Sequence, residues 1–142
     1  MKKIISILLL SGTIFSLSSM AQDNNETSMN LENKAIYLSQ CNNFGTGVSY
    51  FYQSCVNSNF STISRTIGGY LSNCMNMGQE VDYFFTSCVN NNFSSIQRNL
   101  GNSIWLSNCM NFDRKTLDYS FISCVNSNFR TIERELSNKA NE

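Results

Sequence analysis

The chain has 142 residues, with 10 Lys and Arg against 10 Asp and Glu, six cysteines, no proline and no histidine. This balance leaves no basic surface of the kind that binds nucleic acid or anionic lipid. Without histidine the chain also lacks the Ser-His and Cys-His catalytic pairs and a common metal ligand.

The N-terminal residues predict export. Residues 1–21 contain two lysines, a short apolar run and a small-residue end at Ala21, which is typical of a secretory signal peptide. The alternative is a membrane anchor, but the apolar run is shorter than the roughly 20 residues that a spanning helix needs. Cleavage after Ala21 leaves 8 basic and 10 acidic residues, a net charge of −2. We expect no stable membrane insertion of the mature chain, and residues 22–30 are polar and expected to be disordered.

One cysteine-containing phrase occurs three times. It reads SCVNSNF at 54–60 and 123–129, and SCVNNNF at 87–93. The six cysteines fall into two series, with intervals of 33 and 35 residues in the first and 33 and 36 in the second. A period of this length predicts a stacked repeat protein. The first series is Cys41, Cys74 and Cys109, and the second is Cys55, Cys88 and Cys124.

The apolar spacing inside each repeat predicts helices. In the second copy the apolar residues are spaced i, i+3, i+4, i+7, i+8 and i+12, on one helical face. Asparagine can end one helix and cap the next, so the NSN and NNN triplets are expected to lie at helix junctions. The apolar residues of that copy are Val81, Phe84, Phe85, Cys88, Val89 and Phe93. Helices are expected over 31–43, 47–57, 60–76, 79–90, 93–110, 114–126 and 129–138.

These elements predict an all-α fold of stacked αα-hairpin repeats, a short solenoid held by disulfides. The apolar face of a single hairpin is buried only by its neighbours, so the units must stack. We expect one domain, residues 31–142. Its units are about 31–58, 60–91 and 93–127, followed by a capping helix at 129–138.

The period and the stretch SIQRNLGNSIWLSNCMNFDRKTLDYSFISC resemble the αα-hairpin repeats of the tetratricopeptide superfamily, in particular the secreted cysteine-rich Sel-one-like repeat proteins of bacteria. The resemblance covers about residues 47–138 and implies a superhelical scaffold that binds proteins or peptides on its concave side. The matching positions are Leu100 with Gly101, Ile104, Asp113 at the start of a second helix, Phe121 and Cys124, and Ile67 with Gly68 in the preceding unit.

The cysteines are expected to form disulfides, because export leads to an oxidising compartment. Six cysteines allow many complete pairings. Equal treatment of the units favours Cys41 with Cys55, Cys74 with Cys88, and Cys109 with Cys124. The alternative is six buried thiols that act as small apolar residues.

Two polar positions that recur in every unit are the candidate binding residues. Tyrosine and arginine are enriched at binding hot spots, so a repeated row of both can read an extended partner. The alternative is that each arginine bonds a neighbouring group and each tyrosine fills a groove between units. Trp105 is expected in the core. The candidate row is Tyr50, Tyr83, Tyr119, Arg65, Arg98 and Arg134.

No catalytic motif is present, and the paired carboxylates are explained by helix starts, where acids are favourable. We therefore expect a secreted or periplasmic, non-catalytic binding scaffold with a protein or peptide partner. No cofactor, metal or nucleic acid is expected. The alternatives are a structural or stress-resistant component of the cell envelope and a secreted enzyme of unknown class.

Overall fold

The computed structural model describes residues 35–141 and contains three α-helices: α1 (Tyr50–Ile67), α2 (Tyr83–Leu100) and α3 (Tyr119–Lys139). A short 3-10 helix, η1 (Gly101–Ser103), follows α2. Residues 35–141 form no strand, only an isolated bridge between Gly47 and Thr116. The all-α prediction is confirmed. The predicted signal peptide, 1–21, and the polar stretch 22–30 lie outside the described residues.

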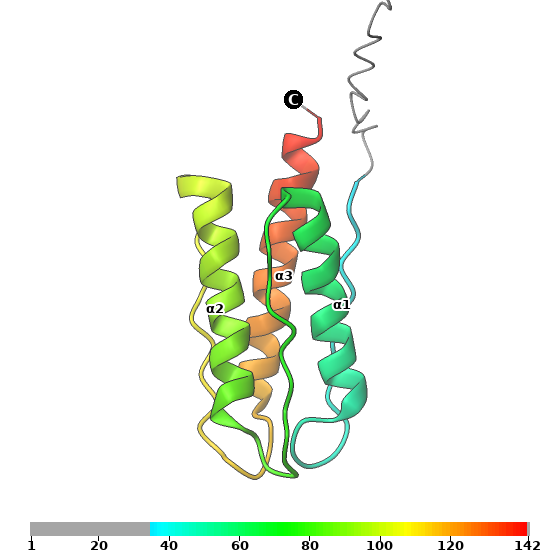
Figure 1. Ribbon diagram of the computed structural model, residues 1–142, viewed down its shortest axis with the longest axis vertical. Helices are drawn as coiled ribbons and strands as arrows, with labels where there is room; N and C mark the ends of the chain where they lie inside the picture. Colours follow the sequence, from blue (N-terminus) through cyan, green and yellow to red (C-terminus); the bar gives the residue numbers. More distant parts are fainter. Residues whose placement is uncertain (1–34, 142) are drawn as a thin grey trace, which may run out of the picture. The chain divides into compact units, whose positions relative to one another are not determined.

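Each repeat unit consists of one linking segment without α-helix followed by one α-helix. The linking segments are residues 35–49, 68–82 and 101–118, and we number them 1 to 3. Figure 1 shows the three helices running in the same direction, while each linking segment carries the chain back to the end where the next helix begins. We call this end, at the bottom of Figure 1, the loop end.

Local chemistry fixes where the helices begin and end. The Ser49 hydroxyl accepts a hydrogen bond from the Tyr52 N–H at 3.2 Å, and the Asp82 carboxylate accepts from the Phe84 N–H at 2.9 Å. Such caps satisfy N–H groups that have no partner within the helix. Gly68 ends α1 with φ of 68°, a left-handed conformation that glycine adopts without steric cost.

The predicted αα-hairpins are wrong, because each asparagine-rich phrase lies inside one continuous helix. The predicted helices 47–57 and 60–76 merge into α1, which ends at Ile67, and the predicted capping helix 129–138 is the second half of α3. Residues 35–43, 68–76 and 104–110 are not helical. Their apolar residues happen to continue the spacing of the helix before them, which explains the error.

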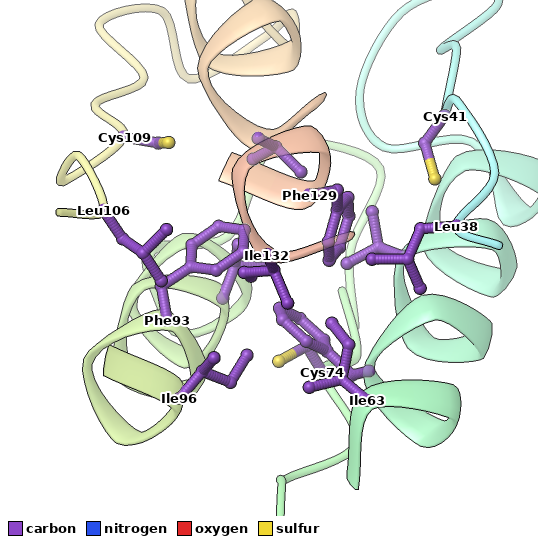
Figure 2. Packing of buried hydrophobic residues seen from close by; sticks show 14 of the residues in the cluster. Leu38, Cys41, Ile63, Cys74, Phe93, Ile96, Leu106, Cys109, Phe129 and Ile132 are labelled. Atoms are coloured by element: carbon purple, nitrogen blue, oxygen red, sulfur yellow. The ribbon is translucent and has the colours of Figure 1, made fainter. Parts of the chain in front are cut away.

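One apolar stripe on each helix faces the other two helices. The stripe has the spacing i, i+4, i+8 and i+11, and its members are at most 2% exposed. At its centre the rings of Phe60, Phe93 and Phe129 meet edge to face, with centroids 5.3, 5.3 and 5.4 Å apart. Such aromatic pairs add about 0.5–1.5 kcal/mol each beyond the burial itself. Figure 2 shows Phe93 and Phe129 between the helices, with Ile63, Ile96 and Ile132 beside them. The stripes are Tyr52, Val56, Phe60 and Ile63; Phe85, Val89, Phe93 and Ile96; and Phe121, Val125, Phe129 and Ile132.

The first asparagine of each phrase holds the linking segment of the next unit. The Asn57 side chain accepts from the Cys74 N–H at 2.8 Å and donates to the Cys74 carbonyl at 2.7 Å. Asn90 forms the same pair of bonds with the backbone of Cys109, each 2.8 Å. An amide offers both a donor and an acceptor, so it replaces the strand partner that this backbone lacks.

The second asparagine holds the linking segment of its own unit. Asn59 accepts from the Ser39 N–H at 2.9 Å and donates to the Ser39 carbonyl at 2.7 Å. Asn92 and Asn128 form the same pairs of bonds with Ser72 and Ser107. All three are at most 4% exposed, and their partners lie outside their own helix. They therefore do not compete with the hydrogen bonds of the helix, and the helix continues through them.

These contacts close the three units into a ring. Asn126 of α3 bonds the Cys41 backbone of linking segment 1 through a donor and an acceptor, both at 2.8 Å. Phe129 of the third unit contacts Phe60 of the first. A solenoid leaves its terminal units apart, whereas here the last unit packs against the first. The predicted open stack is therefore replaced by a closed threefold arrangement.

Each unit contains one disulfide, which joins its linking segment to its helix. The pairs are Cys41–Cys55, Cys74–Cys88 and Cys109–Cys124, with Cα atoms 5.5–5.6 Å apart. These are the pairs that equal treatment of the units predicts, and no cysteine is free. Three disulfides fit an oxidising compartment.

Candidate binding surfaces

The structure separates the predicted tyrosine and arginine row into two groups. Tyr50, Tyr83 and Tyr119 are the first residues of the three helices and are at least 76% exposed. Each arginine follows its tyrosine by 15 residues, which corresponds to about 22 Å along a helix. The tyrosines therefore lie at the loop end and the arginines at the opposite end. The arginines at this opposite end are Arg65, Arg98 and Arg134.

Two of the arginines bond side chains of their own helix. Arg65 donates to the Thr62 hydroxyl at 3.4 Å, and Arg98 donates to the Ser95 hydroxyl at 3.1 Å. All three arginines of the predicted row are exposed. Local bonds of this kind fit the alternative interpretation, in which the arginines serve their own helices.

The loop end carries a set of strongly exposed apolar side chains, which we call the loop-end apolar set. They occupy equivalent positions in the units, at the tip of each loop and in the first two residues of each helix. Their exposed fractions lie between 75% and 84%. The apolar spacing predicts Phe84 on the same helical face as Phe85, but the buried stripe begins one residue later, at Phe85. The set is Phe44, Met77, Phe112, Tyr50, Tyr83, Tyr119, Phe51 and Phe84.

Sequence reasoning missed the three loop-tip residues, although a signal for them exists. Phe44, Met77 and Phe112 each follow the first cysteine of their unit by three residues and come directly after an asparagine. An apolar residue that recurs between turn-forming residues marks an exposed loop tip. The expected helices leave these three residues in the junctions between helices, where no role is assigned to them.

Each linking segment turns at the loop end through a loop, at 43–49, 76–82 and 111–118, and an asparagine in each loop fixes its shape. Asn43 donates to the Gly47 carbonyl at 2.9 Å and accepts from the Ser49 N–H at 2.8 Å. Asn76 bonds the Glu80 carbonyl and the Asp82 N–H in the same way, at 2.9 and 2.6 Å. Asn111 spans the third loop between the Thr116 carbonyl and the Asp118 N–H. The apolar set is therefore presented on folded loops.

The three loops also bond one another. Gly47 N–H donates to the Lys115 carbonyl at 2.9 Å, and Val81 N–H donates to the Arg114 carbonyl at 2.6 Å. Gly47 has φ of 71°, and a Cβ atom there would overlap the carbonyl oxygen of Gln79. Glycine is therefore required at this meeting point of loops one and two.

A groove of about 700 Å³ opens between the second and third loops. Its lining is mixed: Tyr83 and Phe112 are apolar, while Glu80, Asp113 and Arg114 carry charge. The Asp113 carboxylate accepts hydrogen bonds from the Thr116 hydroxyl and the Lys115 N–H, which lower the pKa of this carboxyl below its usual value. The arrangement offers an apolar surface with charges of both signs beside it.

Trp105 does not belong to the core, contrary to the prediction. It is 81% exposed, as is Tyr37, and Tyr70 is 88% exposed. The three residues occupy the same position in the three linking segments, directly before Leu38, Leu71 and Leu106. The leucine takes the inner position in each unit, and the aromatic ring lies outside.

Within residues 35–141, no group of three or more His, Cys, Asp or Glu side chains has the arrangement of a metal site. The same part of the chain has no helix that is both long and apolar enough to span a membrane.

Comparison of the chain with protein-family models, with curated proteins and with solved structures gives no significant match.

Proposed function

We propose that this protein is an exported, non-catalytic binding protein whose loop end docks onto a protein partner. The predicted signal peptide and the three disulfides support a secreted or periplasmic location. The observation that carries the proposal is the loop-end apolar set, with eight large side chains at least 75% exposed.

This exposure is unusual for a small monomer. Scattered apolar residues on a surface need no explanation, but large apolar groups gathered at one end mark an interaction site. Tyrosine and phenylalanine are enriched at the centres of protein interfaces, where they bury a large area with few rotatable bonds. The loops that hold the set are fixed by Asn43, Asn76 and Asn111, so little ordering cost is added on binding.

The charges around the set favour a protein over an anionic surface. Glu80, Asp82, Asp113 and Asp118 outnumber Arg114 and Lys115 in the loops. Such a surface is not attracted to anionic lipid or nucleic acid. A partner with an apolar patch beside basic groups is complementary to it.

The test is photo-crosslinking at chosen positions in the native host. A photoreactive phenylalanine analogue at Phe112 should give one crosslinked protein of defined mass. The same analogue at Arg98, at the opposite end of α2, should give none. Excess wild-type protein should compete the crosslink away. A Phe51→Ser, Phe84→Ser variant should not compete, because it lacks two rings of the loop-end apolar set. Serine is the replacement because it already stands at the third equivalent position, Ser120.

Crosslinking at Arg98 alone, or equal competition by the serine variant, would contradict the loop-end proposal. A crosslink of the protein to itself would replace the partner with a second copy and would also overturn it.

A further inference from the structure

A second surface recurs where each linking segment lies beside the helix of the preceding unit. The units are counted around the ring, so that the third unit precedes the first. These seams lie between α3 and linking segment 1, α1 and linking segment 2, and α2 and linking segment 3, as the asparagine bonds show. Each seam carries one of the exposed rings of Tyr37, Tyr70 and Trp105. We refer to the hollows along them as the seam grooves.

The seam groove between α1 and linking segment 2 has a volume of about 340 Å³. This is close to the lower limit of roughly 300 Å³ for small-molecule sites. Phe60 forms part of its lining and is only 2% exposed, while the Tyr70 ring is 88% exposed. Apart from Leu71, the remaining lining is neutral and polar, and it includes Ser61, Ser72 and Asn73.

The seam groove between α3 and linking segment 1 has the equivalent lining. Its volume is about 260 Å³, and Tyr37, Ser39, Gln40 and Phe129 take the places of Tyr70, Ser72, Asn73 and Phe60. Arg130 and Glu133, whose charges are opposite, replace Ser61 and Ser64. Two seams therefore repeat one arrangement of an aromatic ring, a serine and a side-chain amide.

The third seam has the same construction. The Gln97 side chain accepts from the Leu106 N–H at 3.0 Å, just as the Glu133 side chain accepts from the Leu38 N–H at 3.2 Å. These bonds hold both linking segments against the preceding helix at the same place. Trp105, Ser107 and Asn108 then stand where Tyr70, Ser72 and Asn73 stand in the second seam.

The polar groups of the seams are available to a ligand. Among the described residues, the side chains of Gln40, Asn73 and Asn108 form no hydrogen bond within the protein, and all three are exposed. The same holds for the hydroxyl of Ser61, on the helical side of the second seam. Each amide supplies both donors and an acceptor.

This combination fits a neutral sugar ring. A pyranose has one face of C–H groups that packs on an aromatic ring, and its hydroxyl groups need both donors and acceptors at the edge. The second seam groove has no charged lining residue, so it does not select an anion or a cation.

We propose that the three seam grooves bind neutral pyranose units of a glycan, with Tyr37, Tyr70 and Trp105 as the stacking platforms. The three sites are weak singly because each is shallow. Together they bind a polymeric or surface-bound glycan, since linked sites can raise the overall affinity by about 10²–10⁴-fold without new contacts. This surface is separate from the loop end, so the proposal goes beyond the one above.

The single tryptophan provides a direct readout, because Trp105 stands in the third seam where Tyr70 stands in the second. The full mature protein is titrated with neutral oligosaccharides of glucose, mannose, galactose and N-acetylglucosamine while the tryptophan emission is recorded. At least one should give a saturable change. Binding to the same sugar immobilised on a surface then reports all three grooves together.

Variants distinguish the seams from the loop end. Each of Tyr37→Ala, Tyr70→Ala and Trp105→Ala should lower the apparent affinity for the immobilised glycan by about tenfold or more, and the triple variant should not bind. Tyr119→Ala, which removes an equally exposed ring at the loop end, should bind as the wild type does. Circular dichroism confirms that each variant is folded.

The proposal fails if no neutral oligosaccharide gives saturation at millimolar concentration. It also fails if the triple variant binds the glycan as well as the wild type does, or if only charged ligands or peptides change the emission.

Discussion

Between the helices the three units are nearly identical, whereas at the loop end the third unit differs from the first two. Asn57, Asn90 and Asn126 each accept from a cysteine N–H at 2.8 Å, and the central ring distances differ by only 0.1 Å. Every unit meets both others at the centre, where a phenylalanine recurs in all three.

At the loop end the third unit departs from the first two. Its disulfide spans 15 residues instead of 14, because its loop is longer. The Asp118 carboxylate accepts from the Phe112 N–H at 2.6 Å and does not cap α3, unlike Asp82 at the start of α2. The repeated interior fixes the fold, and the exposed end is free to vary with a ligand.

The largest effect should come from the central rings. Phe93→Ala should lower the free energy of unfolding by about 3–5 kcal/mol, since it removes a buried ring and leaves a cavity that two other rings cannot fill. Phe84→Ala, on the same helix but exposed, should change it by less than about 0.5 kcal/mol. Urea unfolding of both variants measures the difference, and equal losses would contradict the proposed interior.

The disulfides should rank next. Removing one bridge by Cys74→Ala with Cys88→Ala should cost about 3 kcal/mol, because a loop of about 15 residues is released in the unfolded chain. The equivalent double variant at Cys41 and Cys55 should lose the same amount within error. A clear difference between the two in thermal or urea unfolding would show that the units are not equivalent.

The NNN triplet of α2 contains its own control. Asn90→Ala and Asn92→Ala should each cost about 1–3 kcal/mol, because each leaves a backbone N–H and a carbonyl of a linking segment without a partner. Asn91 lies between them and is exposed, so Asn91→Ala should be nearly neutral. If all three variants unfold at the same urea concentration, the side-chain amides do not hold the linking segments.

The smallest effect that we predict is an increase in stability. The Tyr52 hydroxyl is buried without a hydrogen-bond partner, while the equivalent residues are Phe85 and Phe121. Tyr52→Phe should therefore raise the free energy of unfolding by about 1 kcal/mol, and Phe85→Tyr should lower it.

The same residue predicts a dependence on pH. Burial raises the pKa of Tyr52 above its ordinary value. The folded protein therefore holds the Tyr52 proton more tightly than the unfolded chain, in which the pKa is about 10. The stability that comes from this difference is complete below that pKa and is lost as the pH rises above it. Between pH 10 and 12 the wild type should lose stability faster than Tyr52→Phe, and parallel curves would contradict this.

The sequence was sufficient for the repeat, the disulfide pairs and the helical character of the phrases. It did not reveal that the helix continues through the phrase, because Asn57 and Asn59 are stabilised by backbone groups on two linking segments that are distant in the sequence. Asparagine without such partners favours helix ends, which is the rule we applied. Leu71 and Cys74 also continue the apolar spacing of α1, although Gly68 has already ended that helix.

The candidate surfaces were less predictable for the same reason. Recurrence identifies Tyr50, Tyr83 and Tyr119, but Tyr37, Tyr70 and Trp105 lie in segments that are expected to be helical and are not. The loop tips lie in the expected junctions, where no role is assigned to them. Recurrence indicates that a position is used three times. Whether the side chain faces the core or the solvent depends on the path of the backbone.

The ring closure is tested most directly by nuclear Overhauser effects between the aromatic protons of the three central phenylalanines. The structure predicts cross-peaks of similar intensity for Phe60 with Phe93, Phe93 with Phe129, and Phe60 with Phe129, since all three centroid distances are 5.3–5.4 Å. An open stack would give the first two and lack the third. Absence of the Phe60 to Phe129 cross-peak in the folded protein would contradict the closed threefold arrangement.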